Sequence, residues 1–299
     1  MELEKCFESF VQAGRFLKNW SPKTVRSYQQ AFTSFQQSLA SSSADVVADA
    51  GRVVLTKAQL ETWVVWMRQK GMAPGGCNVY IRGFNSFLSW LAEEGHTPTR
   101  LRLKLLKSPT RQLRGFSDAE IRTLVAFRPK SFFDIRTWTL VQTMLDTGIR
   151  IEEALTLRTL QVNLDALTLT VVGKGDKTRT VPFSLELRKV LFRLLQAKEK
   201  TWNQRDVCFC ARNGHRLTYR NSYRDIEKLC KGLGITGEHV HPHALRHAFA
   251  CSYYRQGGDI YRLSRILGHV SISTTQLYLR SMGVEHLAEG HRSPLATRA

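Results

Sequence analysis

The first third of the chain carries apolar residues at helical spacing in four successive stretches. Their ends are marked by residue types typical of helix termini. Ser21-Pro22 and Pro74 begin two of them, Thr56-Lys57-Ala58-Gln59 has the form of a capping box, and Gly71 and Gly95 end the last two. The pattern predicts a small bundle of four helices with these apolar faces: Phe7, Phe10, Val11, Phe16 and Leu17; Val25, Tyr28, Phe32, Phe35 and Leu39; Leu60, Trp63, Val64 and Met67; Ile81, Phe84, Phe87, Leu88 and Leu91.

The rest of the chain mixes helical periods with one two-stranded pattern. Ser117-Asp118-Ala119-Glu120 is a second capping box, and residues 132–145 are predicted to form a buried helix. Leu167–Val172 and Arg179–Phe183 flank a glycine-rich turn, which predicts a β-hairpin. Further elements are expected as helices after Ser184, over residues 219–231 and within 240–278, and as a short strand at 207–209. The fold class is therefore mainly α, with a small β-sheet in the second domain.

Composition narrows the class of partner. A chain of 299 residues that is 42% hydrophobic has room for two domains with cores of their own. The formal net charge is +19 and the isoelectric point is about 10.1, which favours a polyanionic partner. Residues 1–114 hold 16 Lys and Arg residues against 8 Asp and Glu, so the excess is not confined to one tail. Charge alone is equally compatible with a basic protein whose cations only face solvent.

Several other classes are disfavoured. No apolar run reaches the length of a membrane span, and the N-terminus lacks the pattern of a signal peptide, so a cytoplasmic protein is expected. The six cysteines are scattered without a Cys-x-x-Cys pair and are expected to be reduced, mostly buried thiols. They are Cys6, Cys77, Cys208, Cys210, Cys230 and Cys251.

A basic segment separates the two predicted domains. Residues 97–114 contain two prolines and no acidic residue, and we expect them to form a linker. Its cations are Arg100, Arg102, Lys104, Lys107, Arg111 and Arg114. A charge run is usually only solvated, but one that joins two basic domains favours contact with DNA phosphates.

Four polar residues stand out between residues 240 and 278. His243 and Arg246 are three apart, so on a helix they share one face. Gly268 ends an apolar-periodic stretch and places His269 at a helix end, and Tyr278 follows nine residues later. Arginine grips phosphate, histidine moves protons, and tyrosine can act as a nucleophile. These are the groups that metal-free phosphoryl transfer requires.

Two upstream residues complete the set. Arg150 follows Thr147-Gly148-Ile149 and would supply a second phosphate clamp. Lys174 lies in Gly173-Lys174-Gly175 at the tip of the predicted hairpin, where an ammonium could reach a leaving group. This tripeptide is not a nucleotide-binding loop, since the spaced glycines and the Lys-Ser/Thr ending are absent.

In order, these pieces resemble the tyrosine recombinase (phage integrase) family. The matching motifs are Thr147-Gly148-x-Arg150, Gly173-Lys174-Gly175, His243-x-Leu-Arg246-His247, Leu267-Gly268-His269 and the following Tyr278. Each piece is weak alone, but the ordered set is a strong signal. The resemblance implies a helical core-binding domain over residues 1–96, the linker over 97–114, and an α/β catalytic domain over 115–299.

The resemblance also implies roles. Arg150, Lys174, His243, Arg246, His269 and Tyr278 would be catalytic. Glu153 and His247 would support them, while Lys177, Arg179 and the linker cations would bind DNA. The reaction would be site-specific recombination of double-stranded DNA through a 3′-phosphotyrosyl intermediate and a Holliday junction, without metal or cofactor. The family's enzymes form tetramers on DNA, with the C-terminal tail docked on a neighbouring protomer. The expected setting is the nucleoid, and the compact form suits Xer-type, Cre-type or mobile-element enzymes such as integrases, transposases and resolvases.

Other readings remain open. Taken singly, Arg150 could be a surface residue paired with Glu153, Lys174 could be a turn residue without a functional role, and Tyr278 could be a half-buried helix residue. Glu152 is an alternative to Glu153 for the supporting role. His243 and His247 have the spacing of a zinc helix, but Ala244 replaces the required glutamate, so no metal is expected. The alternative functions are type IB topoisomerase-like nicking and closing of one strand, and DNA binding by a regulator that does not cut.

Overall fold

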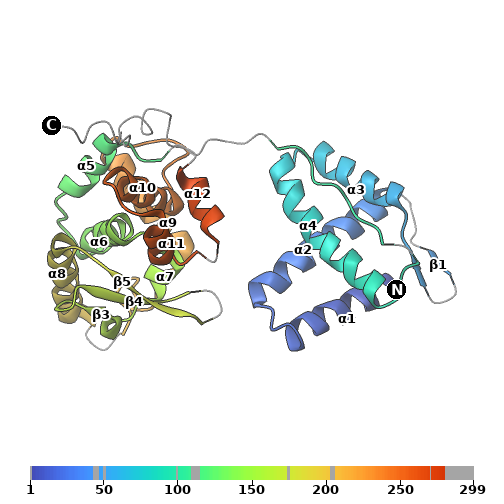
Figure 1. The fold of residues 1–299 in the computed structure, drawn as a ribbon, viewed down its shortest axis with the longest axis horizontal. Coiled ribbons are helices and arrows are strands. Elements are labelled where there is room, and N and C mark those ends of the chain that lie inside the picture. The colour runs from blue at the N-terminus through green and yellow to red at the C-terminus, as the bar shows by residue number, and fades with distance from the viewer. Residues whose placement is uncertain are drawn as a thin grey trace, which may run out of the picture. The chain divides into compact units, whose positions relative to one another are not determined.

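The computed structural model divides the chain into two compact units, residues 1–111 and 112–299. It describes residues 2–42, 47–49, 52–98, 100–108, 115–173, 176–202, 206–269 and 271–279. In a few of these positions, including residues 277–279, only the backbone is described. Residues 1–111 form the N-terminal unit and residues 112–299 form the C-terminal unit (Figure 1).

The N-terminal unit contains the four predicted helices. They are α1 (Glu2–Phe16), α2 (Pro22–Ser42), α3 (Lys57–Gln69) and α4 (Pro74–Glu93). Thr56 and Gln59 form the predicted capping box of α3, and the Ser21 hydroxyl accepts a hydrogen bond from the Thr24 amide at 3.2 Å. Side-chain caps of this kind satisfy amides that have no partner within the helix, which is why the helix starts could be read from the sequence.

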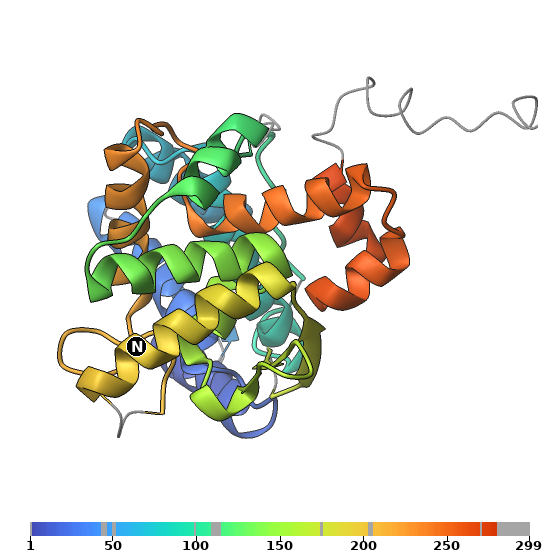
Figure 2. The same cartoon turned by 90° about the vertical axis from the view of Figure 1, so that its left-hand side faces the viewer.

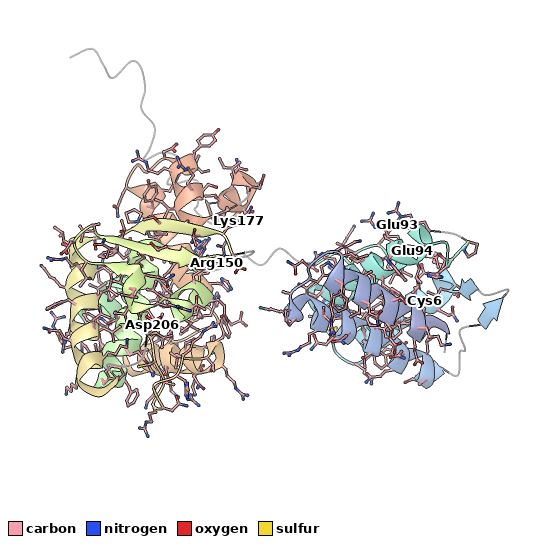
Figure 3. All side chains as sticks on the ribbon, turned by 90° about the horizontal axis from the view of Figure 1, so that it is seen from below. Cys6, Glu93, Glu94, Arg150, Lys177 and Asp206 are labelled. Atoms are coloured by element: carbon pink, nitrogen blue, oxygen red, sulfur yellow. The ribbon has the colours of Figure 1, made fainter. Side chains whose placement is uncertain are left out.

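An aromatic cluster fills this unit. The rings of Phe7 and Phe32 stack with centroids 4.0 Å apart, and Trp63 is fully buried against Phe35 and Phe84. The Trp63 indole nitrogen donates to the Ser34 hydroxyl at 3.0 Å, so its one polar atom is satisfied inside the core. Other side chains of the cluster, among them Cys6, lie in the interior of the same unit (Figure 3).

Two sequence predictions for this unit need correction. Phe16 and Leu17 were assigned to the apolar face of the first helix, but both side chains are 82% exposed. Phe16 lies nine positions after Phe7, which at about 100° per residue places it on the opposite face of the helix. Leu17 follows the last residue of the helix, so the helical period no longer points its side chain inward. Between α2 and α3 the unit also carries a hairpin that the sequence did not indicate, β1 (Val47–Asp49) paired antiparallel with β2 (Arg52–Val54).

The first half of the predicted linker is bound to α4. The Asn85 amide donates to the Leu103 carbonyl and accepts from the Leu103 amide, both at 2.9 Å. One heptad earlier, Asn78 makes the same pair with Leu106 at 2.9 and 2.8 Å. The Leu103 side chain is buried, whereas the basic side chains are exposed at Arg100, Arg102, Lys104 and Lys107. The side chains of the two asparagines thus satisfy backbone groups of this extended segment that would otherwise need a neighbouring strand.

The C-terminal unit packs helices on a small sheet (Figures 1 and 2). The sheet has the order β3-β4-β5 and is antiparallel throughout. Helix α6 is central, with α8 lying beside it and α10 against it. The elements are α5 (Asp118–Ala126), α6 (Phe132–Thr147), α7 (Ile151–Thr156), a 3₁₀ turn (Thr159–Gln161), β3 (Val162–Asn163), β4 (Thr168–Val172), β5 (Thr178–Pro182), α8 (Leu185–Trp202), α9 (Tyr219–Gly232), α10 (Pro242–Arg255), α11 (Ile260–Leu267) and α12 (Ile272–Leu279).

The predicted fold class is confirmed, with small local differences. The hairpin, the Ser117 capping box and the helix after Ser184 are present as predicted. β3 was not predicted, and the expected strand at residues 207–209 is reduced to an isolated bridge between Arg158 and Val207. The core is mainly aliphatic and is built around the fully buried Leu140, Leu155 and Leu191. No helix in the described ranges is both long and apolar enough to cross a membrane.

Candidate active site

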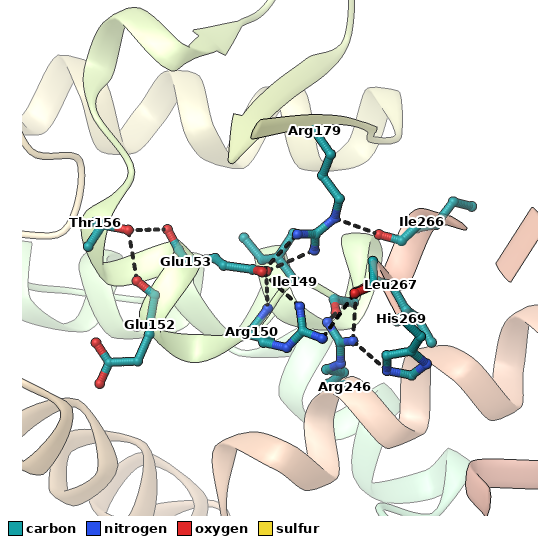
Figure 4. A network of polar contacts seen from close by, with 12 residues as sticks. Ile149, Arg150, Glu152, Glu153, Thr156, Arg179, Arg246, Ile266, Leu267 and His269 are labelled. Carbon is teal, nitrogen blue, oxygen red and sulfur yellow. Dashed lines mark hydrogen bonds and ion pairs between the residues drawn. The ribbon is translucent and has the colours of Figure 1, made fainter. Parts of the chain in front are cut away.

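Three distant segments bring polar side chains together in the C-terminal unit (Figure 4). They are the turn between α6 and α7, the middle of α10, and the end of α11. The turn exists because Gly148 ends α6 with φ of 62°, a left-handed conformation that glycine adopts without strain. A Cβ atom on Gly148 would also lie 2.2 Å from Cδ1 of Phe249, so both the conformation and the space require glycine.

Arg246 is the buried member of the site. Arg246 is 1% exposed, and backbone carbonyls accept hydrogen bonds from its guanidinium. Nη1 donates to the Gly148 carbonyl at 2.7 Å, and Nη2 donates to the Leu267 carbonyl at 2.8 Å. A permanently charged guanidinium held among carbonyl dipoles forms a fixed positive centre.

Arg150 is the accessible member. It is the N-cap residue of α7, and its side chain is 38% exposed. Nη1 donates to Oε1 of Glu153 at 2.9 Å, and Nη2 donates to the Gly268 carbonyl at 3.2 Å. These two contacts aim the guanidinium toward the same place as Arg246 while leaving part of it open to solvent.

His269 joins the two arginines. Arg246 Nη2 lies 2.9 Å from its Nε2, and Thr275 Oγ1 of α12 lies 2.8 Å from its Nδ1. Because a guanidinium can only donate, Nε2 must accept, so the proton is on Nδ1 and faces Thr275. Burial, together with the positive charges of Arg246, Arg150 and Arg179, lowers the pKa of His269 to about 4. The imidazole is therefore neutral near pH 7.

Glu153, rather than Glu152, is the acid inside the site. Glu153 is 4% exposed and accepts from the Arg150 amide at 2.8 Å, whereas the Glu152 side chain is 56% exposed and pairs with Arg216. Burial by itself would raise the pKa of Glu153, but hydrogen bonds from Arg179 and Arg150 outweigh it and lower this pKa. The carboxylate is therefore an anion near pH 7, in contact with Arg150.

The remaining predicted residues differ in what the structure describes. His243 is exposed in the first turn of α10, and His247 is buried one turn later. Lys177 is exposed on the hairpin, as Figure 3 shows, while Lys174 lies outside the described residues. Tyr278 belongs to α12, which packs on α10 and α11, but its side chain is not among those described. Arg111 and Arg114 also lie outside the described residues.

The histidine cluster before α10 is divided among different partners. His239 Nε2 lies 3.1 Å from Oε1 of Glu120, and His241 Nδ1 accepts from the Ala244 amide and so caps α10. The part of the chain that the structure describes contains no group of three or more His, Cys, Asp or Glu side chains arranged to hold a metal ion.

Two members of the network were not assigned to it from the sequence. Arg179 was expected to bind DNA, but its side chain is 17% exposed and its guanidinium reaches Glu153 and the Ile266 carbonyl. Thr275 was not singled out at all. Its signal was only a hydroxyl three residues before Tyr278, since nothing in the sequence shows that it meets His269.

Comparison with known proteins identifies the family of the chain. Residues 115–283 match the model of the phage integrase family, which is more than half of the chain, so the chain belongs to this family of tyrosine recombinases. Enzymes of this family cleave and rejoin DNA strands.

Curated relatives extend the similarity over both units. A protein of Yersinia pestis named tyrosine recombinase XerC is 28% identical over 94% of this chain and 91% of its own length. A XerC of Xanthomonas campestris pv. campestris is 30% identical over 79% of this chain and 72% of that protein.

A solved structure shares the fold. It is the XerH site-specific recombinase bound to a palindromic difH substrate in a post-cleavage complex. Its TM-score is 0.71 at 19% identity, over 92% of this chain and 80% of that one.

Proposed function

We propose that the chain is a site-specific recombinase that cuts and rejoins double-stranded DNA through a 3′-phosphotyrosyl intermediate on Tyr278. The observation that supports it is the convergence of Arg150, Arg246 and His269 from three segments onto one place. Helix α12, which includes Tyr278, is tied to this place by the Thr275–His269 hydrogen bond. Both the curated relatives and the family model describe tyrosine recombinases.

The roles follow from the charges. The guanidinium groups of Arg150 and Arg246 offset the charge of the scissile phosphate and stabilise the added charge of the pentavalent transition state. The Tyr278 oxygen forms a bond to phosphorus as the bond from phosphorus to the 5′ oxygen breaks. The phenol, whose ordinary pKa is roughly 10, gives its proton to the exposed imidazole of His243, because both ring nitrogens of His269 are already engaged. Lys174 donates a proton to the departing 5′ oxygen.

Rejoining needs no further energy source. The tyrosyl phosphodiester keeps the bond energy of the original linkage, so a 5′ hydroxyl can attack it and release Tyr278. When the attacking hydroxyl belongs to a partner duplex, the product is a Holliday junction. The chain therefore requires neither metal nor nucleotide for either step.

Binding is proposed to use both units. The exposed cations Arg100, Arg102, Lys104, Lys107 and Lys177 would contact the phosphate backbone, together with Arg111 and Arg114. The residues after Tyr278 would dock on a neighbouring protomer, so that the active form is a tetramer on DNA. The enzyme would act in the cytoplasm on nucleoid DNA.

Covalent capture tests the proposal. The full chain is incubated, in the presence of a chelator and without nucleotide, with nicked duplexes that lose a short fragment on cleavage and so trap the adduct. Wild type and Tyr261→Phe, a 70% exposed tyrosine of α11, are expected to form an adduct that survives denaturing gels, whereas Tyr278→Phe is expected to form none. DNA binding should be equal in all three proteins.

Two outcomes contradict the proposal in different ways. An adduct that persists in Tyr278→Phe shows that the nucleophile is another residue. No adduct with wild type, on the flanking sequences of its own genome and under conditions where duplex is bound tightly, favours a regulator that does not cut.

A further inference from the structure

Arg179 makes three side-chain hydrogen bonds within the site. It projects from β5, and Nη1 and Nη2 donate to the two carboxylate oxygens of Glu153 at 2.7 and 2.8 Å. This is the parallel, two-point geometry that a planar guanidinium forms with a carboxylate. With Glu153 4% exposed and the Arg179 side chain 17% exposed, solvent screens the pair little.

The carboxylate that Arg179 grips also holds Arg150. Oε2 of Glu153 accepts from the Arg150 amide at 2.8 Å, and Oε1 accepts from Arg150 Nη1 at 2.9 Å. Four donors from two arginines therefore meet on one carboxylate, as Figure 4 shows. The position of Glu153, and through it the direction of the Arg150 guanidinium, depends on Arg179.

The third contact of Arg179 reaches the other side of the site. Its Nε donates to the Ile266 carbonyl at 3.0 Å, in the last turn of α11. A Cβ atom on Gly268 would lie 3.0 Å from Cζ of Arg179, so the guanidinium also packs on the residue that precedes His269. One side chain from the sheet thus touches the start of α7 and the end of α11.

We propose that Arg179 is a positioning residue for strand cleavage, which holds Glu153 so that Arg150 faces the scissile phosphate. This role depends on the function proposed above. A direct contact with DNA suits the geometry poorly, because Nε, Nη1 and Nη2 are all engaged inside the protein. Arg150, with 38% of its side chain exposed, is the group that faces outward.

The first measurement is the single-turnover rate of adduct formation on saturating suicide duplex. Arg179→Met is expected to lower this rate by about 10²-fold, because a displacement of roughly 1 Å in a positioned group can have an effect of that size. Arg179→Lys keeps the charge but cannot form the two-point contact, so it should restore only part of the rate. DNA affinity at fixed salt should change by less than about threefold, since a buried group neutralises no phosphate.

A matched control is available on the adjacent glutamate. Arg216 donates to Glu152 at 2.5 Å in a pair whose side chains are 45% and 56% exposed. Arg216→Met removes an arginine–glutamate pair of the same chemistry outside the site. Its adduct formation is expected to match wild type.

A neutral substrate separates positioning from general support of the fold. In a methylphosphonate linkage, a methyl group replaces one non-bridging oxygen and removes the negative charge that Arg150 offsets. Attack by Tyr278 still forms one bond to phosphorus and releases the same 5′ hydroxyl. The defect of Arg179→Met should therefore shrink at least about tenfold on this substrate, as should that of Arg150→Ala, if the loss is one of charge stabilisation.

Each outcome decides a different point. Equal losses for Arg179→Met on both substrates mean that Arg179 only supports the fold, and wild-type rates for Arg179→Met mean that it does not position Arg150; either result overturns the inference. If wild type forms no adduct on the phosphodiester, the proposed function itself fails. Should Arg179→Met not fold, as judged by circular dichroism, Arg179→Lys carries the same two-substrate comparison.

Discussion

The two units differ in the kind of side chain that they bury. The N-terminal unit buries aromatic rings, such as Phe7, Phe35 and Trp63, which pack mainly against one another. Around its active site the C-terminal unit buries charges, with Arg246 1% and Glu153 4% exposed. Apolar packing has many acceptable solutions, whereas a buried charge needs each partner in place.

This difference explains what each unit shows in its sequence. A core of aromatic rings is visible in the sequence only as the helical spacing of apolar residues. The N-terminal unit therefore has predictable helices but no recognisable motif. A network of charged residues and glycines requires particular residue types at particular spacings in the sequence. The C-terminal unit can therefore be recognised from Thr147-Gly148-x-Arg150 and Leu267-Gly268-His269. Substitutions in the first unit should therefore change stability, and substitutions in the second should change activity more than stability.

The largest stability effect is expected at Trp63. Trp63→Ala removes a fully buried ring and the donor to Ser34, and should lower the free energy of unfolding by about 3–5 kcal/mol. Urea denaturation of the full chain measures it. Phe16→Ala, at an 82% exposed ring of the same unit, should stay within about 0.5 kcal/mol of wild type. A large loss for Phe16→Ala would mean that this ring is covered in the folded protein.

The largest activity effect among the arginines is expected at Arg246. Arg246→Met removes the buried positive centre and should slow adduct formation by about 10²–10³-fold, the cost of losing one preorganised donor. Arg255→Met is the control on the same helix, since that arginine pairs with Asp118 in a contact exposed to solvent. Rates are compared per folded molecule, and similar rates for both variants would remove Arg246 from the site.

A smaller effect is expected where the backbone turns. Gly148→Ala forces a side chain into a left-handed conformation and against Phe249, and should destabilise the chain by about 1–3 kcal/mol. Gly75→Ala in α4 meets no atom within 4 Å and should be neutral or stabilising by up to about 1 kcal/mol. Equal thermal shifts in both variants would contradict this contrast between the units.

The smallest effect is a dependence of stability on pH. His269 has its pKa lowered from 6.5 to about 4 in the folded chain, so the unfolded chain binds the proton first. The contribution of neutral His269 to the free energy of unfolding is complete above pH 6.5 and is lost as the pH falls toward 4. His241, whose pKa is also lowered, acts in the same direction, whereas Glu153 acts below pH 4.5.

The variant His269→Asn isolates this contribution. Urea midpoints measured between pH 7 and 4.5 should fall less steeply in His269→Asn than in wild type, because one of the groups that must gain a proton is gone. Parallel curves would show that His269 does not carry the neutral form inferred from its contact with Arg246.

Local signals predicted most of the fold. Helix starts at Thr56 and Ser117 could be read from caps, because a cap and its partner lie three residues apart. The direction of Leu17 could not, since a period gives the face of a helix but not where the helix ends. β1 and β2 are three residues each, too short to produce an alternating pattern.

The site was predictable as a set of residues but not as a set of contacts. Spacing brought Arg150 and Glu153 together because they are neighbours on one helical turn. The partner of Arg179 lies 26 residues away in another element, and no local rule relates a strand residue to a helix carboxylate. Thr275 meets His269 only through the packing of α12, which likewise depends on tertiary structure.

The carbonyls that hold the two arginines have a consequence for mutational tolerance. Gly148, Leu267 and Gly268 contribute main-chain oxygens, which every amino acid possesses. A deep mutational scan should therefore show that position 267 accepts other apolar residues. Positions 148 and 268 should accept almost no other residue, because both have a left-handed backbone conformation that other amino acids adopt only with strain. Glu153 would be the intolerant position whose side chain itself supplies the anchor.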